Sequence, residues 1–283
     1  MKYEMFGKVV DGLQRIIAIK YFGNVKAGDI GGWIFSEANL SQEGLCWVYD
    51  DARVYDDANV CGNAVVEGYA TVSDNAMVYN KAWVCGDAVV CGDACVYGEA
   101  KVGGKARVYD HAMVYNKARV YDHAMVYNKA RVYDHAWVYD HANVCGNAVV
   151  EGYATVSDNA MVYGNAVVKD KAVVGDNAEV YGCAIVFDNA EVFDNAVVRD
   201  NAVVRGNAIV EDDAIVEDDA VVCDNAFVSG NVVVKGQAAV RGNAEVYGNA
   251  VVYGDAEVGG NAVVYGTDNV YGNATAAVVC IMK

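Results

Sequence analysis

The six residues Asn261–Gly266, NAVVYG, are one copy of a pattern that fills most of the chain. Val stands at every sixth position from Val48 to Val264, and Ala follows four residues after nearly all of these valines, with Val232 as the exception. A short, fixed period indicates an architecture in which each copy is one structural unit. We therefore expect one elongated body, although a length of 283 residues would allow two domains.

The residue types within each copy predict a strand followed by a corner. In an extended strand the residue before Val, Val itself and the residue after it point outward, inward and outward. The next two positions hold Gly or Asp and then Asn, Asp, Lys or His, which are turn formers that favour the left-handed backbone region. Ala then returns inward at a corner too tight for a larger side chain. The pattern predicts an all-β solenoid with strands stacked about 4.8 Å apart.

The spacing of an aliphatic residue, Asn and a small residue resembles the hexapeptide repeat of the acyltransferase superfamily that folds as a left-handed parallel β-helix. The segment Val25–Val54, VKAGDIGGWIFSEANLSQEGLCWVYDDARV, further resembles the entry segment of YdcK-type transferase-like proteins of bacteria and phages. The resemblance implies a left-handed helix with three hexapeptides in each triangular coil, hence about 12–13 coils between residues 48 and 274. Unlike that family, this chain places Gly two positions after the aliphatic residue, and Tyr often stands between them.

The two ends depart from the repeat. Residues 1–47 contain β-prone runs, and Asp11-Gly12 between two such runs predicts a hairpin. Because a solenoid exposes backbone and core at its ends, we interpret residues 1–47 as an N-terminal cap and residues 48–274 as the solenoid. Residues 275–283 are apolar and fit either a last strand or a short tail.

The formal net charge of −17 at pH 7 disfavours nonspecific binding to nucleic acid or to an anionic membrane. Residues 101–142 carry an excess of Lys and Arg, whereas residues 174–226 carry a large excess of Asp and Glu. The basic and the acidic segment either orient self-association or are solvated surface. Asp268 falls on an inward Ala position, where burial of its carboxylate is costly unless the coil opens.

The composition also bears on the cellular compartment. No run of about 18 apolar residues is present, which excludes a transmembrane helix, and the first residues do not resemble a secretory signal. The 9 cysteines are odd in number and lack the spacing of a metal site. We therefore predict a cytoplasmic protein with free thiols.

Residues 18 positions apart are expected to stack on one face, because three hexapeptides complete a coil in the resembled superfamily. Adjacent pairs in outward rows contribute about 0.2–1 kcal/mol each. Apolar rows of this length are seldom exposed on a soluble monomer, so we predict side-by-side self-association, with packing inside the rows alone as the alternative. The predicted rows are Tyr79, Tyr97, Tyr115 and Tyr133; Tyr109 and Tyr127, with Tyr163 and Tyr181 further along; Tyr121 and Tyr139; and Val197, Ile215, Val233 and Val251.

Two internal duplications indicate that the faces are interchangeable. The segment at residues 58–79 recurs identically at residues 142–163, and KARVYDHAMVYN at residues 105–116 recurs at residues 117–128. Both shifts are whole hexapeptides but not whole coils, so each copy is expected on a different face from its parent. This disfavours a single specialised ligand groove or ice-binding plane.

The four histidines are the candidates for chemistry, because hexapeptide acyltransferases use a His general base at an acyl-CoA site between the subunits of a trimer. All four stand at the turn position before Ala, which Asn or Lys occupies elsewhere, and the sequence has no inserted loop to shape a pocket. A structural turn role is therefore favoured, with His123 and His141, which are 18 positions apart, as the catalytic alternative. The histidines are His111, His123, His135 and His141.

A run of carboxylates at Val210–Ala220, VEDDAIVEDDA, has the oxygen ligands that Ca²⁺ prefers. Its two acidic triplets are six residues apart, so they are expected on adjacent faces instead of stacking. We favour a solvated acidic edge and predict no metal site.

These observations leave three functions. The leading prediction is a non-catalytic structural scaffold without a cofactor, whose outward rows assemble the chain with itself into an oligomer or a fibre. The alternative implied by the resemblance is a trimeric acyltransferase that uses acyl-CoA. A further alternative is a module that binds glycans or a partner protein through its Tyr rows.

Overall fold

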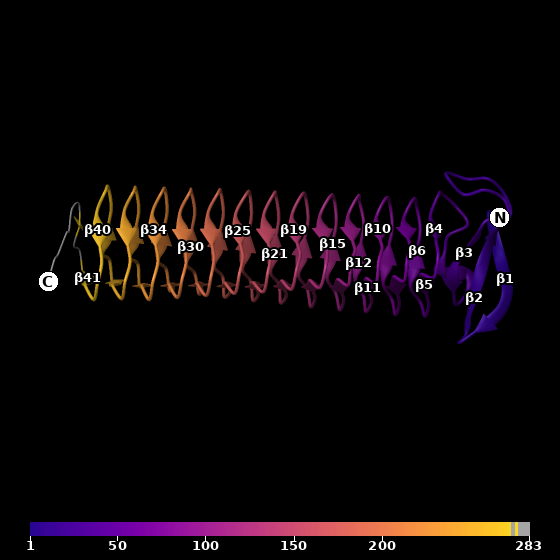
Figure 1. Cartoon of the computed structure of the whole chain (residues 1–283), viewed down its shortest axis with the longest axis horizontal. Coiled ribbons are helices and arrows are strands. Elements are labelled where there is room, and N and C mark those ends of the chain that lie inside the picture. The colour runs from indigo at the N-terminus through magenta and orange to yellow at the C-terminus, as the bar shows by residue number, and fades with distance from the viewer. Residues whose placement is uncertain (273–274, 277–283) are drawn as a thin grey trace. The chain divides into compact units, whose positions relative to one another are not determined.

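The chain folds into an all-β solenoid, and its computed structural model describes residues 1–272 and 275–276. This confirms the predicted fold class, since parallel strands pair with partners 18 residues along the chain. Within the described residues the one helix is a 3-10 turn, η1 (Glu37–Asn39). The chain divides into two compact units, residues 1–140 and 141–283. Figure 1 shows the strands of each unit following one another coil by coil.

The first unit begins with an antiparallel hairpin. β1 (Tyr3–Val10) and β2 (Leu13–Ala18) are joined by a turn at Asp11-Gly12, where φ is 52° and 81°. The predicted Asp-Gly hairpin is therefore present. β3 (Ile30–Ile34) pairs antiparallel with β2 and parallel with β5 (Arg53–Val54), so it joins the hairpin to the first coils.

The side chain of Gln42 covers the start of β1. Its Oε1 accepts hydrogen bonds from the backbone nitrogens of Lys2 at 2.7 Å and Tyr3 at 3.4 Å, and its Nε2 donates to the Tyr3 carbonyl at 3.1 Å. The buried Lys2 side chain donates from Nζ to the carbonyl oxygen of Cys46 at 2.8 Å. These contacts occupy backbone groups at a sheet edge that would otherwise be available to another strand.

The core of each unit is a column of Val and Ala. Nearly all later strands are two residues long, the residue before Val and Val itself, and the repeat valines and alanines are 0–1% exposed. Branched Val suits the strand, and Ala suits the corner. Val232, which stands in an Ala position, is also 0% exposed, so the corner accepts a larger side chain than predicted.

Backbone hydrogen bonds join each coil to the next. The N–H of the residue before Val donates to the carbonyl of an Ala 17 residues ahead, as from Arg53 to Ala70 at 2.9 Å. The N–H after Val donates to a Val carbonyl, as from Tyr55 to Val72 at 3.1 Å. Because the chain has 0 Pro, every residue after the first can donate to these ladders.

The coils of the first unit have three faces, each named here by its first and last coil strands. The β5–β17 face consists of β5, β8 (Thr71–Val72), β11 (Val89–Val90), β14 (Arg107–Val108) and β17 (Met125–Val126). The β4–β19 face consists of β4 (Trp47–Val48), β7 (Val65–Val66), β10 (Trp83–Val84), β13 (Lys101–Val102), β16 (Arg119–Val120) and β19 (Trp137–Val138). The β6–β18 face consists of β6 (Asn59–Val60), β9 (Met77–Val78), β12 (Cys95–Val96), β15 (Met113–Val114) and β18 (Arg131–Val132).

The second unit also has three faces. The β20–β41 face consists of β20 (Asn143–Val144), β23 (Met161–Val162), β26 (Glu179–Val180), β29 (Val197–Val198), β32 (Ile215–Val216), β35 (Val233–Val234), β38 (Val251–Tyr253) and β41 (Asn269–Tyr271). The β22–β40 face consists of β22 (Thr155–Val156), β25 (Val173–Val174), β28 (Glu191–Val192), β31 (Ile209–Val210), β34 (Phe227–Val228), β37 (Glu245–Val246) and β40 (Val263–Val264). The β21–β42 face consists of β21 (Val149–Val150), β24 (Val167–Val168), β27 (Ile185–Val186), β30 (Val203–Val204), β33 (Val221–Val222), β36 (Ala239–Val240), β39 (Glu257–Val258) and β42 (Thr275–Ala276).

The shorter duplication changes face as predicted. Its first copy places Arg107 on β14, and its second copy places the equivalent Arg119 on β16, which belongs to another face of the first unit. Arg107 is exposed and Arg119 is half-buried. The same residues therefore meet different neighbours on the two faces.

The C-terminal coil contains a polar defect. Asp268 is half-buried, and its Oδ2 atom is enclosed without a hydrogen-bond partner in the described structure. The predicted tail lies mainly outside the described residues, since residues 273–274 and 277–283 are not described. The described part of the tail is β42, which pairs parallel with β39.

Candidate functional site: the corners and outward rows of the coils

The first corner position, two residues after Val, takes the left-handed conformation. Asp122 and Asp134 have φ of 60° and 58°, whereas His123 and His135, which follow them, do not have positive φ. The explanation of the histidines as residues suited to the left-handed region is therefore wrong. One left-handed residue is enough to turn each corner, and Gly, Asp or Asn supplies it.

Aspartate at this first corner position also accepts a hydrogen bond from the next coil. Asp74 Oδ2 lies 3.0 Å from the backbone nitrogen of Gly92, and Asp110 Oδ2 lies 3.1 Å from that of Asn128. Gly can turn the same corner but has no side chain to accept this bond. The main role of the corner aspartates is thus to join neighbouring coils.

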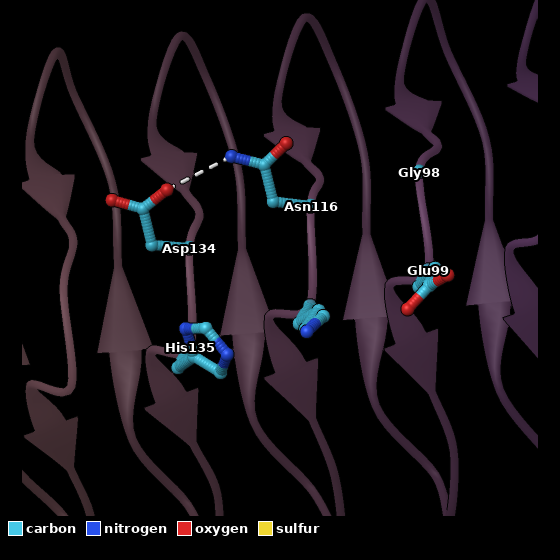
Figure 2. A pocket seen from close by; sticks show the side chains of 6 residues that line it. Gly98, Glu99, Asn116, Asp134 and His135 are labelled. Carbon is cyan, nitrogen blue, oxygen red and sulfur yellow. Dashed lines mark hydrogen bonds between the residues drawn. The ribbon is translucent and has the colours of Figure 1, made fainter.

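Three successive corners of the β6–β18 face enclose an open recess of about 450 Å³ that contains His135 (Figure 2). Inside it, Asn116 Nδ2 donates to Asp134 Oδ1 at 2.9 Å, the bond drawn in Figure 2. Glu99 also pairs with Lys81 at 3.0 Å, which holds the pKa of the Glu99 carboxyl below its ordinary value. The recess is lined by Gly98, Glu99, Asn116, Lys117, Asp134 and His135.

A second recess of about 420 Å³ lies over the corners that contain Asp93 and His111. His111 Nδ1 lies 3.1 Å from Asp93 Oδ2, and the two side chains are 62% and 48% exposed. A carboxylate can fix the orientation of an imidazole, as a catalytic base requires. Both recesses are open, however, and neither encloses a substrate as deep ligand pockets do.

The predicted catalytic alternative, His123 and His141, is divided between the two units. The His123 backbone nitrogen donates to the Asp140 carbonyl, and that of His141 donates to the Asp158 carbonyl, each at 2.7 Å. Their backbones therefore continue the ladders of their own units. The predicted stacking of their side chains stays a prediction.

The tyrosine rows form as predicted on two faces of the first unit. Rings of Tyr79, Tyr97, Tyr115 and Tyr133 stack in succession with centroids 4.7–4.8 Å apart. The rings of Tyr109 and Tyr127 stack at 4.9 Å on another face. In the second unit, Tyr163 and Tyr181 stack at 4.7 Å.

Tyr121 and Tyr139, the third predicted row, each pack against a further residue. A side chain built on Gly103 would meet the Tyr121 ring at 2.6 Å, so this ring lies over the glycine one coil earlier. Tyr139 packs edge-on against Trp137, with centroids 6.5 Å apart. Tyr121 thus packs over the glycine one coil earlier, and its stacking on Tyr139 stays a prediction.

The aliphatic row also forms, since Val197, Ile215, Val233 and Val251 pair in register along the β20–β41 face. The sequence analysis missed a second row on the β21–β42 face, although the same 18-residue spacing would have found it. All of these rows are half-buried or buried by their neighbours. The missed row is Val149, Val167, Ile185, Val203, Val221 and Ala239.

The acidic run lies at two corners of the second unit, where most of its carboxylates accept hydrogen bonds from neighbouring coils. Asp213 accepts from Asn195 at 3.0 Å, and Asp219 accepts from Asn201 at 3.0 Å. Asn side chains continue similar ladders at other corners. The longest connects Asn189, Asn207, Asn225, Asn243 and Asn261, with donor–acceptor distances of 2.9–3.0 Å.

The 8 cysteines of the described chain are unpaired thiols. Cys46 is buried in the core, in the register of the repeat alanines. Cys223 directly follows a repeat Val, at an outward position of its hexapeptide, but it is only 5% exposed, and burial raises the pKa of its thiol. Outward positions on these crowded faces are therefore not always accessible.

Parts of the repeat match a known family of solenoid repeats. The model of the YdcK beta solenoid repeat matches residues 70–86, 106–120, 118–134 and 154–170. These four stretches are similar to the YdcK-type repeat. An Escherichia coli (strain K12) protein named "Uncharacterized acetyltransferase YdcK" is 58% identical over 38 residues, which are 13% of this chain and 12% of that protein. The match thus spans about an eighth of the curated relative, and the activity in its name belongs to that protein.

Among the residues that the structure describes, no helix is long and apolar enough to span a membrane.

Proposed function

We propose that the chain is a non-catalytic structural scaffold that associates with copies of itself through its outward rows. The observation that carries this proposal is the uniformity of the coils. Strands recur at six-residue intervals from β4 to β40, and no loop is inserted between them. Because a small-molecule site must bury most of its ligand, the open corners of such coils are better suited to contacts with large surfaces.

The outward rows support side-by-side association. Stacked tyrosines present flat, regular strips in which little conformational entropy remains to be lost on binding. The contacts of Lys2 and Gln42 with backbone groups near the N-terminus disfavour growth by strand pairing at that end. The 8 described free thiols suit the reducing cytoplasm, where we place this scaffold.

Light scattering behind size exclusion on matched variants tests the proposal. The double change Tyr97→Ser with Tyr115→Ser removes the middle of the longest stacked row and is expected to lower the average mass. Tyr69→Ser is the control, because Tyr69 is 69% exposed and lies at a corner outside these rows. Equal masses for wild type and the double variant, with both folded, would refute assembly through this row.

A second function is favoured by one observation, the pairing of His111 with Asp93 beside an open recess, together with the acetyltransferase name of the relative. Under this alternative the chain is a trimer that binds acyl-CoA. Calorimetric titration with acetyl-CoA tests it, with His111→Asn as the control, because Asn stands at this corner position in many other coils. Binding that the variant abolishes would favour the enzyme over the scaffold.

A further inference from the structure

Two neighbouring cations on the β4–β19 face lack an acidic partner. Lys101 and Arg119 are directly opposite each other in register, on β13 and β16. Neither forms an ion pair within 4.0 Å in the described part of the chain. Like charges directly opposite each other destabilise a sheet, so the pair is unfavourable in the isolated chain.

Two tryptophans flank this pair of cations. Lys101 Nζ lies 4.7 Å from the Trp83 ring centroid, and the Arg119 guanidinium lies 4.7 Å from that of Trp137. The cations thus turn away from each other, each toward its own ring. Trp137 is 45% exposed, and Trp83 Nε1 is enclosed without a hydrogen-bond partner. We call Trp83, Lys101, Arg119 and Trp137 the basic aromatic surface.

The second unit carries an acidic counterpart on its β22–β40 face. Glu191 is opposite Ile209 on the neighbouring strand, and Glu211 follows directly after that strand. Neither forms an ion pair within the described residues. Burial and then the neighbouring carboxylates of Asp212 and Asp194 raise the pKa of the Glu211 carboxyl, so a cation from outside would relieve this site. We call Glu191 and Glu211 the acidic surface.

We propose that the basic aromatic surface of one copy binds the acidic surface of a second copy. This inference rests on the self-association proposed above and names its contact. Each surface is unfavourable alone and is neutralised by the other, which is the charge complementarity expected of a specific interface. Trp137 adds an aromatic anchor of the kind that dominates binding energy at interfaces.

Charge reversal on each surface gives two complementary variants. The basic variant is Glu191→Lys with Glu211→Lys, and the acidic variant is Lys101→Glu with Arg119→Glu. The fold is expected to tolerate them, because Glu179 already stands at the position equivalent to Lys101, and Lys169 at the position equivalent to Glu211. Arg53→Glu, an exposed change at the equivalent strand position on the β5–β17 face, is the matched control.

Sedimentation velocity at one total concentration then distinguishes the outcomes. Each reversed variant alone is expected to associate about tenfold more weakly than wild type. A 1:1 mixture is expected to recover wild-type association, because every surface again meets its opposite charge. Association unaffected by reversal, or not recovered by mixing, would overturn this inference alone. A wild type that stays monomeric at every concentration would overturn the proposed scaffold itself.

Discussion

The Oδ2 atom of Asp74 accepts a hydrogen bond from the backbone nitrogen of Gly92, one coil further along, at 3.0 Å. Asp74 has a φ of 57°, so the residue that turns the corner also joins it to the next corner. Several aspartates in both units repeat this relationship. It explains why Asp alternates with Gly at this position, although Gly turns the corner at no steric cost.

Asp74→Ala is expected to destabilise the first unit by about 1–2 kcal/mol, because Ala loses the hydrogen bond and is strained at positive φ. Asp74→Gly loses only the bond and should cost less. Thermal unfolding measures both, and Asp57→Ala at the exposed neighbouring position is the control. If Gly proved as costly as Ala, backbone strain would not contribute.

The asparagine ladder predicts a dependence on position. Asn225 donates to Asn243 and accepts from Asn207, whereas Asn261 is the last described member and only accepts. Asn225→Ala is therefore expected to lower stability by about 1–2 kcal/mol, roughly twice the effect of Asn261→Ala. Denaturant unfolding of the two variants compares them. Equal effects would mean that the ladder bonds contribute little beyond hydration.

Asp268→Ala is expected to stabilise the last coils by about 1–3 kcal/mol, because it removes an enclosed carboxylate oxygen that has no partner. Ala also restores the residue found at nearly every other inward corner. Hydrogen exchange of the amides in β38 and β40 measures the local effect. Ala250→Asp, the reverse change one coil earlier, should weaken the protection of these amides. Weaker protection in Asp268→Ala together with stronger protection in Ala250→Asp would contradict this account.

Tyr163 predicts a specific pH dependence. Burial and a 3.0 Å hydrogen bond to Glu179 raise its pKa above the ordinary value of about 10. The pKa of Tyr163 is higher in the folded than in the unfolded protein. Its contribution to the free energy of unfolding is therefore complete below about pH 10 and is lost as the pH rises through the folded pKa. Tyr163→Phe should cost about 1 kcal/mol at pH 8 and progressively less above pH 10. Tyr69→Phe, at an exposed position, is the control. A stability difference between wild type and Tyr163→Phe that stays constant with pH would contradict the assigned role of Tyr163.

The six-residue period predicted the strands, the corners and the core of Val and Ala, whereas the 18-residue register came from the resemblance to the hexapeptide-repeat superfamily. Spacing also placed the stacked tyrosines Tyr97 and Tyr115 correctly. It did not show which neighbouring residue a side chain packs against. Gly103 lets Tyr121 lie over it, and no count of residue spacing shows which way a ring will lean.

The corners were the least predictable part. Sequence reasoning assigned positive φ to the whole two-residue turn, but only the first residue adopts it, so His123 needs another explanation. The pairing of Trp83 with Lys101 and of Arg119 with Trp137 was also missed. Both pairs are 18 residues apart, so the spacing places each cation beside its tryptophan, although they mix residue types within one row.

Light scattering of the wild-type chain over a wide concentration range tests the central claim most directly. A self-associating scaffold predicts an average mass that rises with concentration and passes beyond that of a trimer, with elongated assemblies in negative-stain images of the same fractions. A mass fixed at that of one chain of 30.2 kDa across the range would contradict it.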